Sequence, residues 1–224
     1  MASACGNWPR ENIETPSLNR LLTGCLNSIN HTPAHMLIAF HKPYGVLSQF
    51  TTDGSPHKTL SAFGFPPRVY PIGRLDADSE GLLLLSDEPA WNDRLLNPRR
   101  GHGREYWVQV EGTPTKDSLA KLQAGLFIQG EKTKPCQAWR LEPQPLLEPR
   151  IPPIRVRKSI PDTWIGMILT EGKNRQVRRM TAQIGHPTLR LIRVRIGNFE
   201  VFHIPLGQWQ SLTPQDILLV DGVV

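Results

Sequence analysis

The sequence predicts an α+β domain in which helices flank a central mixed, mostly antiparallel sheet. Two observations favour this class. Segments with the apolar patterns of strands and helices follow one another in irregular order. Residues 188–196 and 199–204 are joined by Gly197 and Asn198, which is typical of an antiparallel hairpin. A doubly wound parallel sheet would instead require strands and helices to alternate regularly.

The first half of the chain contains four expected strands and one helix. Residues 1–34 are rich in Asn, Ser, Thr and Pro and are expected to form a flexible tail, followed by one domain over residues 35–224. Four consecutive leucines indicate a buried strand. Ser86 or Asp87 can cap a helix that ends at Pro98. The expected strands are 36–40, 46–50, 81–85 and 104–111.

The second half is interrupted by a proline-rich insertion. Six prolines lie between residues 142 and 161, so this segment is expected to be an extended loop. Thr115 and Asn174 are expected to cap helices. The expected helices are 115–125, 175–184 and a short one after Thr213 and Pro214. The expected strands are 137–141, 163–170, 188–196 and 199–204.

Positive charge is concentrated in one part of the chain. The 224 residues suffice for one sizeable domain, and the formal net charge is +6 with a sequence pI of about 9.5. Between residues 151 and 195 ten basic residues face two acidic ones, a local charge of +8. Such a face favours a polyanionic partner, although a mildly basic enzyme with a small substrate is the alternative.

Several other classes of protein find no support in the sequence. The three cysteines are odd in number and widely separated, so we expect neither a disulfide framework nor a zinc site, and a reducing, cytoplasmic location is the simplest. His31 and His35 have no further ligands near them, and no metal is expected. No apolar run is long enough for a membrane span, and no glycine-rich phosphate loop indicates a nucleotide cofactor.

Asp76 is the first candidate for chemistry. It follows Gly73, Arg74 and Leu75, and the leucine-rich strand comes directly after it. A carboxylate at the point where a buried strand reaches the surface is well mounted for a reaction. A cap or a plain surface charge is the alternative, because turns favour aspartate in any case.

A basic helix and a strand tyrosine are the other candidates. Arg175, Arg178 and Arg179 crowd the first turns of the expected helix, where the helix dipole disfavours cations. Phosphates or a carboxylate would neutralise them; a solvated basic face is the alternative. Tyr106 and Trp107 are adjacent in a strand, so one aromatic ring faces each side of the sheet. Either a cleft or the core can receive Tyr106.

Three blocks in order resemble the ribosomal RNA pseudouridine synthases of the small-subunit and large-subunit type. They are Lys42–Val46, Gly73–Asp76 and Glu171–Met180. The resemblance extends from Met36 to Thr213. Residues 152–161, 175–182 and 185–193 are most similar to the E branch of the large-subunit enzymes, which modifies one uridine of 23S rRNA near the peptidyl-transferase region.

This resemblance implies the pseudouridine synthase catalytic fold, with a catalytic cleft across the sheet and no cofactor. Asp76 would be the nucleophile or the base, Tyr106 would stack on the target uracil, and Arg178 would pair with Asp76. Arg74 would help to extrude the base. The expected RNA-binding residues are Lys173, Arg175, Arg179, Arg155, Arg157, Lys158, Arg190 and Arg193.

The implied reaction agrees with the residues. Uracil is detached from its ribose, rotated and rejoined through carbon, and a carboxylate can attack the sugar carbon or remove a neighbouring proton. The carboxylate must be ionised, which an adjacent guanidinium favours, and the base must be flipped out to be reached. No redox, phosphoryl-transfer or metal-dependent step is required.

The partner is expected to be 23S rRNA, with no membrane and with the protein a monomer. Relatives of the small-subunit type begin with a separate RNA-binding domain, which residues 1–34 are too few and too polar to form. A non-catalytic RNA-binding protein is the alternative, but it predicts loss of Asp76, Tyr106 or Arg178, and all three are present. A ribosome assembly factor is a third possibility that is compatible with activity.

Overall fold

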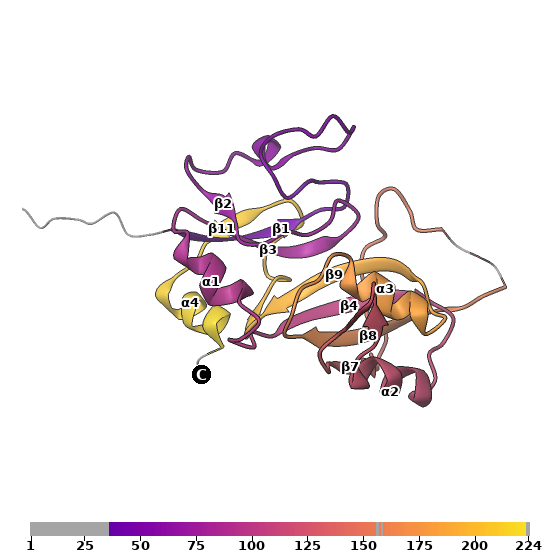
Figure 1. Ribbon diagram of the computed structural model, residues 1–224. Coiled ribbons are helices and arrows are strands. Elements are labelled where there is room, and N and C mark those ends of the chain that lie inside the picture. The colour runs from indigo at the N-terminus through magenta and orange to yellow at the C-terminus, as the bar shows by residue number, and fades with distance from the viewer. Residues whose placement is uncertain (1–35, 156, 158, 223–224) are drawn as a thin grey trace, which may run out of the picture. The chain divides into compact units, whose positions relative to one another are not determined.

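The computed structural model describes residues 36–155, 157 and 159–222, so the expected tail over 1–34 lies outside the described residues. Seven strands form the path β11-β1-β3-β9-β4-β8-β7 of one sheet, in which β10 also pairs with β9 and β2 with β3 (Figure 1). The strands of this sheet are β1 (Leu37–Lys42), β2 (Tyr70–Pro71), β3 (Glu80–Ser86), β4 (Arg104–Glu111), β7 (Gln137–Arg140), β8 (Asp162–Leu169), β9 (Thr188–Ile196), β10 (Phe199–Glu200) and β11 (Trp209–Ser211).

The remaining elements are a small hairpin and the helices. They are β5 (Phe127–Ile128), β6 (Glu131–Lys132), the 3-10 helix η1 (Leu60–Phe63), α1 (Ala90–Leu96), α2 (Lys116–Ala124), α3 (Gln176–Gln183) and α4 (Pro214–Asp221). The large sheet is mixed, because β3 and β9 pair in parallel and the other strand pairs of the sheet are antiparallel. The predicted fold class is therefore confirmed.

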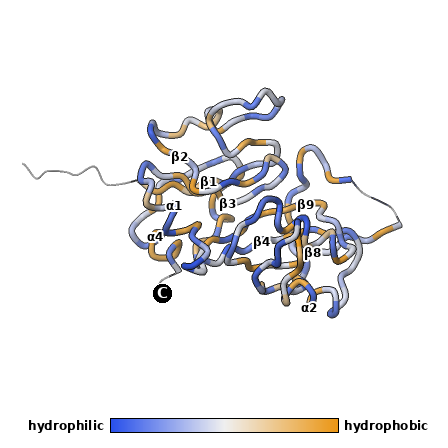
Figure 2. The backbone as a smooth tube through the Cα atoms, viewed as in Figure 1, coloured by the Kyte–Doolittle hydropathy of each residue, from blue (hydrophilic) through white to orange (hydrophobic). Residues whose placement is uncertain are grey.

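The run of leucines in β3 is buried on both faces of the sheet. Leu82 and Leu84 belong to the core that α1 and α4 cover, whereas Leu83 and Leu85 point into a second core with Phe40. Successive strand residues face opposite sides, so a strand covered on both faces is apolar throughout. Figure 2 shows this as a hydrophobic stretch along β3.

The other part of the sheet has a third core beneath α2 and α3. Val108 and Val110 of β4 pack there with Val177 and Met180 of α3. Tyr106 is half-buried and packs against the same cluster. Tyr106 and α3 therefore lie on the same side of the sheet.

The two parts of the sheet meet along a short parallel contact. Glu80 pairs with Ile192, and Gly81 pairs with Arg193. A Cβ atom on Gly81 would lie 2.2 Å from the carbonyl oxygen of Arg193, and the φ of Gly81 is +104°. Glycine is thus required where β3 and β9 approach each other.

Some of the predicted elements are wrong in position or kind. Residues 46–50 form no regular strand; Val46 makes one isolated bridge to Lys58, and Ser48 is used to hold the Asp76 turn. Asn174 does not cap α3, since the cap position is Arg175 in the left-handed conformation, with φ 49°. Thr115 does cap α2, accepting a hydrogen bond from the Ser118 amide. The hairpin strand predicted over 199–204 is β10, which ends at Glu200.

Candidate active site

The backbone of the turn that carries Asp76 is held by hydrogen bonds to the residues on both sides of Asp76. The Ser48 hydroxyl donates to the Leu75 carbonyl at 2.7 Å and accepts from the Leu75 amide at 3.0 Å. The Gly45 amide donates to the Ala77 carbonyl at 2.7 Å. The Lys42–Val46 block and the Asp76 turn, distant in sequence, are therefore one structural unit. The carboxylate is thereby mounted on a fixed backbone.

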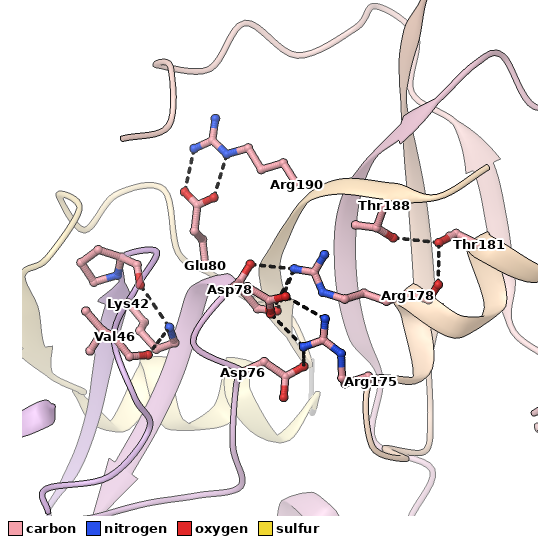
Figure 3. A network of polar contacts seen from close by, with 12 residues as sticks. Lys42, Val46, Asp76, Asp78, Glu80, Arg175, Arg178, Thr181, Thr188 and Arg190 are labelled. Carbon is pink, nitrogen blue, oxygen red and sulfur yellow. Dashed lines mark hydrogen bonds and ion pairs between the residues drawn. The ribbon is translucent and has the colours of Figure 1, made fainter. Parts of the chain in front are cut away.

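Two arginines from the start of α3 reach this turn (Figure 3). Arg175 donates to the Asp78 carboxylate at 2.8 and 3.2 Å and lies 3.5 Å from the Asp76 carboxylate. Arg178 donates to the backbone carbonyl of Asp78 at 2.6 Å and lies 3.3 Å from its carboxylate. Asp78 is thus the centre of the cluster, while the side chain of Asp76 remains 36% exposed.

The charges in this cluster stabilise one another. Burial raises the pKa of Asp78, but the hydrogen bond from Arg175 and the positive charges of Arg178 and Arg175 outweigh it and hold the pKa below its ordinary value. Burial lowers the pKa of Arg178, and the charge of Asp78 opposes that effect. Hydrogen bonding to Asp78 raises the pKa of Arg175, against its partial desolvation. Asp78, Arg175 and Arg178 are therefore all ionised near neutral pH.

The structure shows no ion pair between Arg178 and Asp76, which the resemblance predicted. Arg175 occupies that place, because it precedes the helix in a left-handed conformation. Arg178 lies deeper, with 13% of its side chain exposed, and its guanidinium is used by Asp78 and by the hydroxyl of Ser79 at 3.4 Å. Arg178 therefore holds the backbone of the turn, and the charge of Asp76 acts on it without forming an ion pair.

Lys42 and Glu80 form a buried layer beneath the turn. The Lys42 ammonium donates to the carbonyls of Val46 at 2.7 Å and Pro43 at 3.1 Å. Burial lowers the pKa of Lys42 to about 7, although Glu80, Asp78 and Asp76 oppose this effect. Glu80 accepts two hydrogen bonds from Arg190, at 2.7 and 2.8 Å.

Tyr106 has a buried cation as its cross-strand neighbour. It pairs with Arg193 of β9, whose Nε donates to the Leu82 carbonyl at 2.7 Å. Burial lowers the pKa of Arg193, and its interaction with the Tyr106 hydroxyl opposes that effect. Tyr106 is thus placed on the side of the sheet from which α3 delivers Arg175 and Arg178.

The predicted RNA-binding residues divide into surface and buried groups. Arg190 and Arg193, predicted to bind RNA, are instead buried: they are 9% and 4% exposed and donate hydrogen bonds to Glu80 and to the Leu82 carbonyl. Lys158 lies outside the described residues. The others are at the surface, several with partners: Arg155 is exposed, Arg157 pairs with Glu111, Lys173 with Glu131, and Arg179 bonds Asn174 and Gln129. Arg74 is exposed and donates to Gln49 at 3.3 Å.

Two residues of the cluster were not selected from the sequence. Asp78 lies two positions after Asp76. The sequence signal for it was a second carboxylate in the same turn, which the arginines at 175, 178 and 179 could neutralise. Lys42 is buried and lies in the first of the three matching blocks. A lysine on an apolar strand signals a buried charge, since it must then find partners.

The site presents a partly exposed carboxylate on a hydrogen-bonded turn, flanked by guanidinium groups that suit a polyanionic substrate. Within the described residues no cluster of His, Cys, Asp and Glu could hold a metal ion. None of the helices in the described part of the chain is long and apolar enough to cross a membrane.

Comparison with known proteins identifies the family. Residues 36–183 match the family described as RNA pseudouridylate synthase. The "Ribosomal large subunit pseudouridine synthase E" of Xanthomonas campestris is 52% identical over 176 residues, which are 78% of this chain and 94% of that protein. The protein of the same name from Vibrio vulnificus is 44% identical over 177 residues, 79% of this chain and 75% of that one. The chain therefore belongs to the RNA pseudouridylate synthase family.

A solved structure described as "Crystal structure of pseudouridylate synthase" shares the fold. Its TM-score is 0.67 at 23% sequence identity, and the match covers 83% of this chain and 74% of that chain. The central mixed sheet is thus the fold expected from the three sequence blocks.

Proposed function

We propose that this protein isomerises a specific uridine of 23S ribosomal RNA to pseudouridine. The observation that carries the proposal is the partly exposed Asp76 carboxylate, held on a hydrogen-bonded turn and 3.5 Å from Arg175. The names of the Xanthomonas and Vibrio relatives, which are large-subunit enzymes, support the choice of RNA.

In the proposed reaction Asp76 acts on the ribose of a flipped uridine. It either attacks C1′ or removes the neighbouring proton at C2′, and in both cases the bond between C1′ and N1 breaks. The detached uracil rotates and C5 bonds to C1′, while the ester bond from Asp76 to C1′ breaks or the proton returns to C2′. C5 then loses its proton, and N1 of the uracil gains one. Tyr106 stacks on the uracil, and Arg74 helps to hold the base outside the helix.

The arginines of α3 divide the work. Arg175 lies 3.5 Å from the Asp76 carboxylate and can contact a phosphate of the substrate, because 42% of its side chain is exposed. Arg178 fixes the backbone of the turn through the carbonyl of Asp78. Lys173, Arg179, Arg155 and Arg157 are the proposed backbone contacts, and these position the RNA without reading its sequence.

We further propose that the protein acts as a monomer in the bacterial cytoplasm. The decisive experiment is to map pseudouridines in 23S rRNA from cells with and without this protein. One pseudouridine should disappear without it and return on complementation with the wild-type chain. An unchanged map of 23S rRNA would refute the proposed substrate.

A further inference from the structure

The proline-rich segment, residues 142–155, brings an arginine beside the catalytic turn that neither the sequence blocks nor the proposed mechanism uses. The guanidinium carbon of Arg150 lies 4.0 Å from the centre of the Tyr44 ring. Tyr44 precedes Gly45, whose amide is bonded to Ala77 between Asp76 and Asp78. The stacked pair is therefore connected directly to the backbone of the Asp76 turn.

The guanidinium of Arg150 is held in a fixed orientation by its own segment. Its Nε donates to the carbonyl of Pro152 at 2.8 Å, and Nη2 donates to that of Pro153 at 3.1 Å. The segment is anchored in turn by the Glu148 carbonyl, which accepts from the buried Arg190 at 2.8 Å. Prolines restrict the backbone further. Arg150 is thus preorganised, which reduces the entropy cost of binding.

The charge of Arg150 is not balanced locally. Among the described residues no carboxylate forms an ion pair with it. It also lies close enough to Arg178 for its positive charge to lower the pKa of that guanidinium. Two cations held near each other are stabilised when a polyanion binds. A purely structural arginine would be expected to have an acidic partner here.

The position of Arg150 determines which nucleotide it can reach. Leu147 of the segment packs with Trp107, Trp164 and Ile192, and Trp107 faces the opposite side of the sheet from its neighbour Tyr106. Arg150 therefore approaches the Asp76 turn from the side away from Tyr106. If Tyr106 stacks on the target uracil, Arg150 is placed for a neighbouring nucleotide of the same strand.

Space for a planar group exists beside Arg150. It lines a cavity of about 280 Å³ together with apolar side chains that include Pro149, Pro153 and Trp164. Tyr44 covers one face of the guanidinium, and Arg150 remains partly exposed. A guanidinium plane is a good stacking surface for an unpaired base.

We propose that Arg150, stacked on Tyr44, is a specificity-determining residue that binds the base of a nucleotide flanking the target uridine. This inference rests on the proposed function, because it requires an RNA substrate whose uridine is flipped out. Arg150 is not a catalytic residue in this account. It fixes the register in which the strand crosses the Asp76 turn.

The first test measures tritium release from unmodified 23S rRNA transcribed with 5-[³H]uridine. Arg150→Ala should lower kcat/KM by about fivefold to a hundredfold, the range for loss of one stacked base. Arg150→Lys should be equally impaired, because it keeps the charge and loses the plane. Arg99→Ala is the matched control, since it removes one exposed arginine that is not among the proposed RNA contacts; it should stay within about twofold of wild type. Recovery of the rate in Arg150→Lys would overturn the stacking role.

The second test separates recognition from a structural effect on the turn. Once the uridine is mapped, a stem-loop containing it is made with single abasic nucleotides on either side, and binding to the Asp76→Asn protein is measured. One abasic position should weaken binding to the protein with Arg150 and leave binding to the Arg150→Ala version unchanged. If Arg150→Ala is equally sensitive at every position, the inference is refuted. Absence of tritium release by wild type would refute the proposed function itself, which is a different outcome.

Discussion

Lys42 is a single buried residue whose pKa should make the stability of the fold depend on pH. It donates to two backbone carbonyls of the turn whose Gly45 amide is bonded to Ala77. The ammonium is fully buried, and its pKa falls to about 7 from the ordinary 10.5. Folding therefore favours the neutral amine in the range above neutrality.

The free energy of unfolding should rise with pH above 7 because of this lysine. Between the two pKa values the unfolded chain binds more protons than the folded one, so the slope contributed is positive, up to about 1.4 kcal/mol per pH unit. Lys42→Met should lose this slope, and Lys121→Met, at an exposed helix position, should keep it. Denaturant unfolding between pH 7 and about 8 measures this slope, because unfolded thiols, with a pKa of about 8.5, are still mostly protonated there. Parallel pH profiles for wild type and Lys42→Met would contradict the assignment.

The two arginines of the cluster should differ in their importance for turnover. Arg178 is largely buried and holds the Asp78 backbone, whereas Arg175 is 42% exposed and pairs with exposed or half-buried carboxylates. Removing a buried charge costs about 3–5 kcal/mol, so Arg178→Ala should lower the single-turnover rate at least about a hundredfold. Arg175→Ala should lower it about fivefold, as for exposed ion pairs. The opposite order would mean that Arg175 is the essential partner.

At the scale of elements, β3 was predictable because four consecutive leucines indicate a strand that is buried on both faces, and they pack in two different cores. The bounds of β4 agree with the prediction over 104–111. The strand is covered on both faces, since Val108 packs in one core and Trp107 against another. The turns were harder. Residues 46–50 have the composition of a strand, but Ser48 is needed to bind Leu75, and that tertiary contact overrides local propensity.

Short strands and helix ends carried little signal. β2 has two residues and depends on pairing with β3, which no local pattern specifies. The turn at Gly197 and Asn198 predicted the pairing of β10 with β9, but not that β10 ends at Glu200. The start of α3 is set by Arg175 in the left-handed region, where an asparagine one residue earlier was the expected cap. That displacement decides which arginine faces Asp76. The sequence therefore identified Asp76, Arg175 and Arg178 but not Asp78, and the pairing of these groups depended on backbone geometry.

The contact between β3 and β9 should be sensitive to the ion pair that spans it. Glu80 and Arg190 have 3% and 11% of their side chains exposed. Glu80→Gln leaves a buried guanidinium without its counter-charge and should lower the free energy of unfolding by about 3–5 kcal/mol. Glu200→Gln, at an exposed position of β10, should change it by less than about 0.5 kcal/mol. Denaturant unfolding at neutral pH tests this; equal stability of the two variants would show that the pair contributes little.

At the scale of the described domain, the sheet brings together residues that are about a hundred positions apart. Arg175 and Arg178 of α3 meet Asp76 and Asp78, which follow β2 in the other part of the sheet. The parallel contact at Gly81 keeps these parts in register. The spacing of residues in the sequence did not predict that these arginines and aspartates lie together. The resemblance of three sequence blocks to one enzyme family did predict it.

Composition also misjudged part of the basic surface. Ten basic residues between 151 and 195 suggested one RNA-binding face, yet Arg190 and Arg193 stabilise the interior. Charge along a chain does not distinguish an inward from an outward strand residue unless the strand register is known. Among the described residues, the basic side chains left at the surface come from α3 and its preceding turn, from Arg155 and Arg157, and from the half-buried Arg195 of β9.

The central claim is that the Asp76 carboxylate performs the reaction, and tritium release tests it most directly. Asp76→Asn should release no tritium from 5-[³H]uridine-labelled 23S rRNA above background while binding the RNA about as tightly as wild type, because the backbone of its turn does not depend on the charge. Asp117→Asn, at an exposed position of α2, should release tritium at the wild-type rate. Normal release by Asp76→Asn would contradict the account.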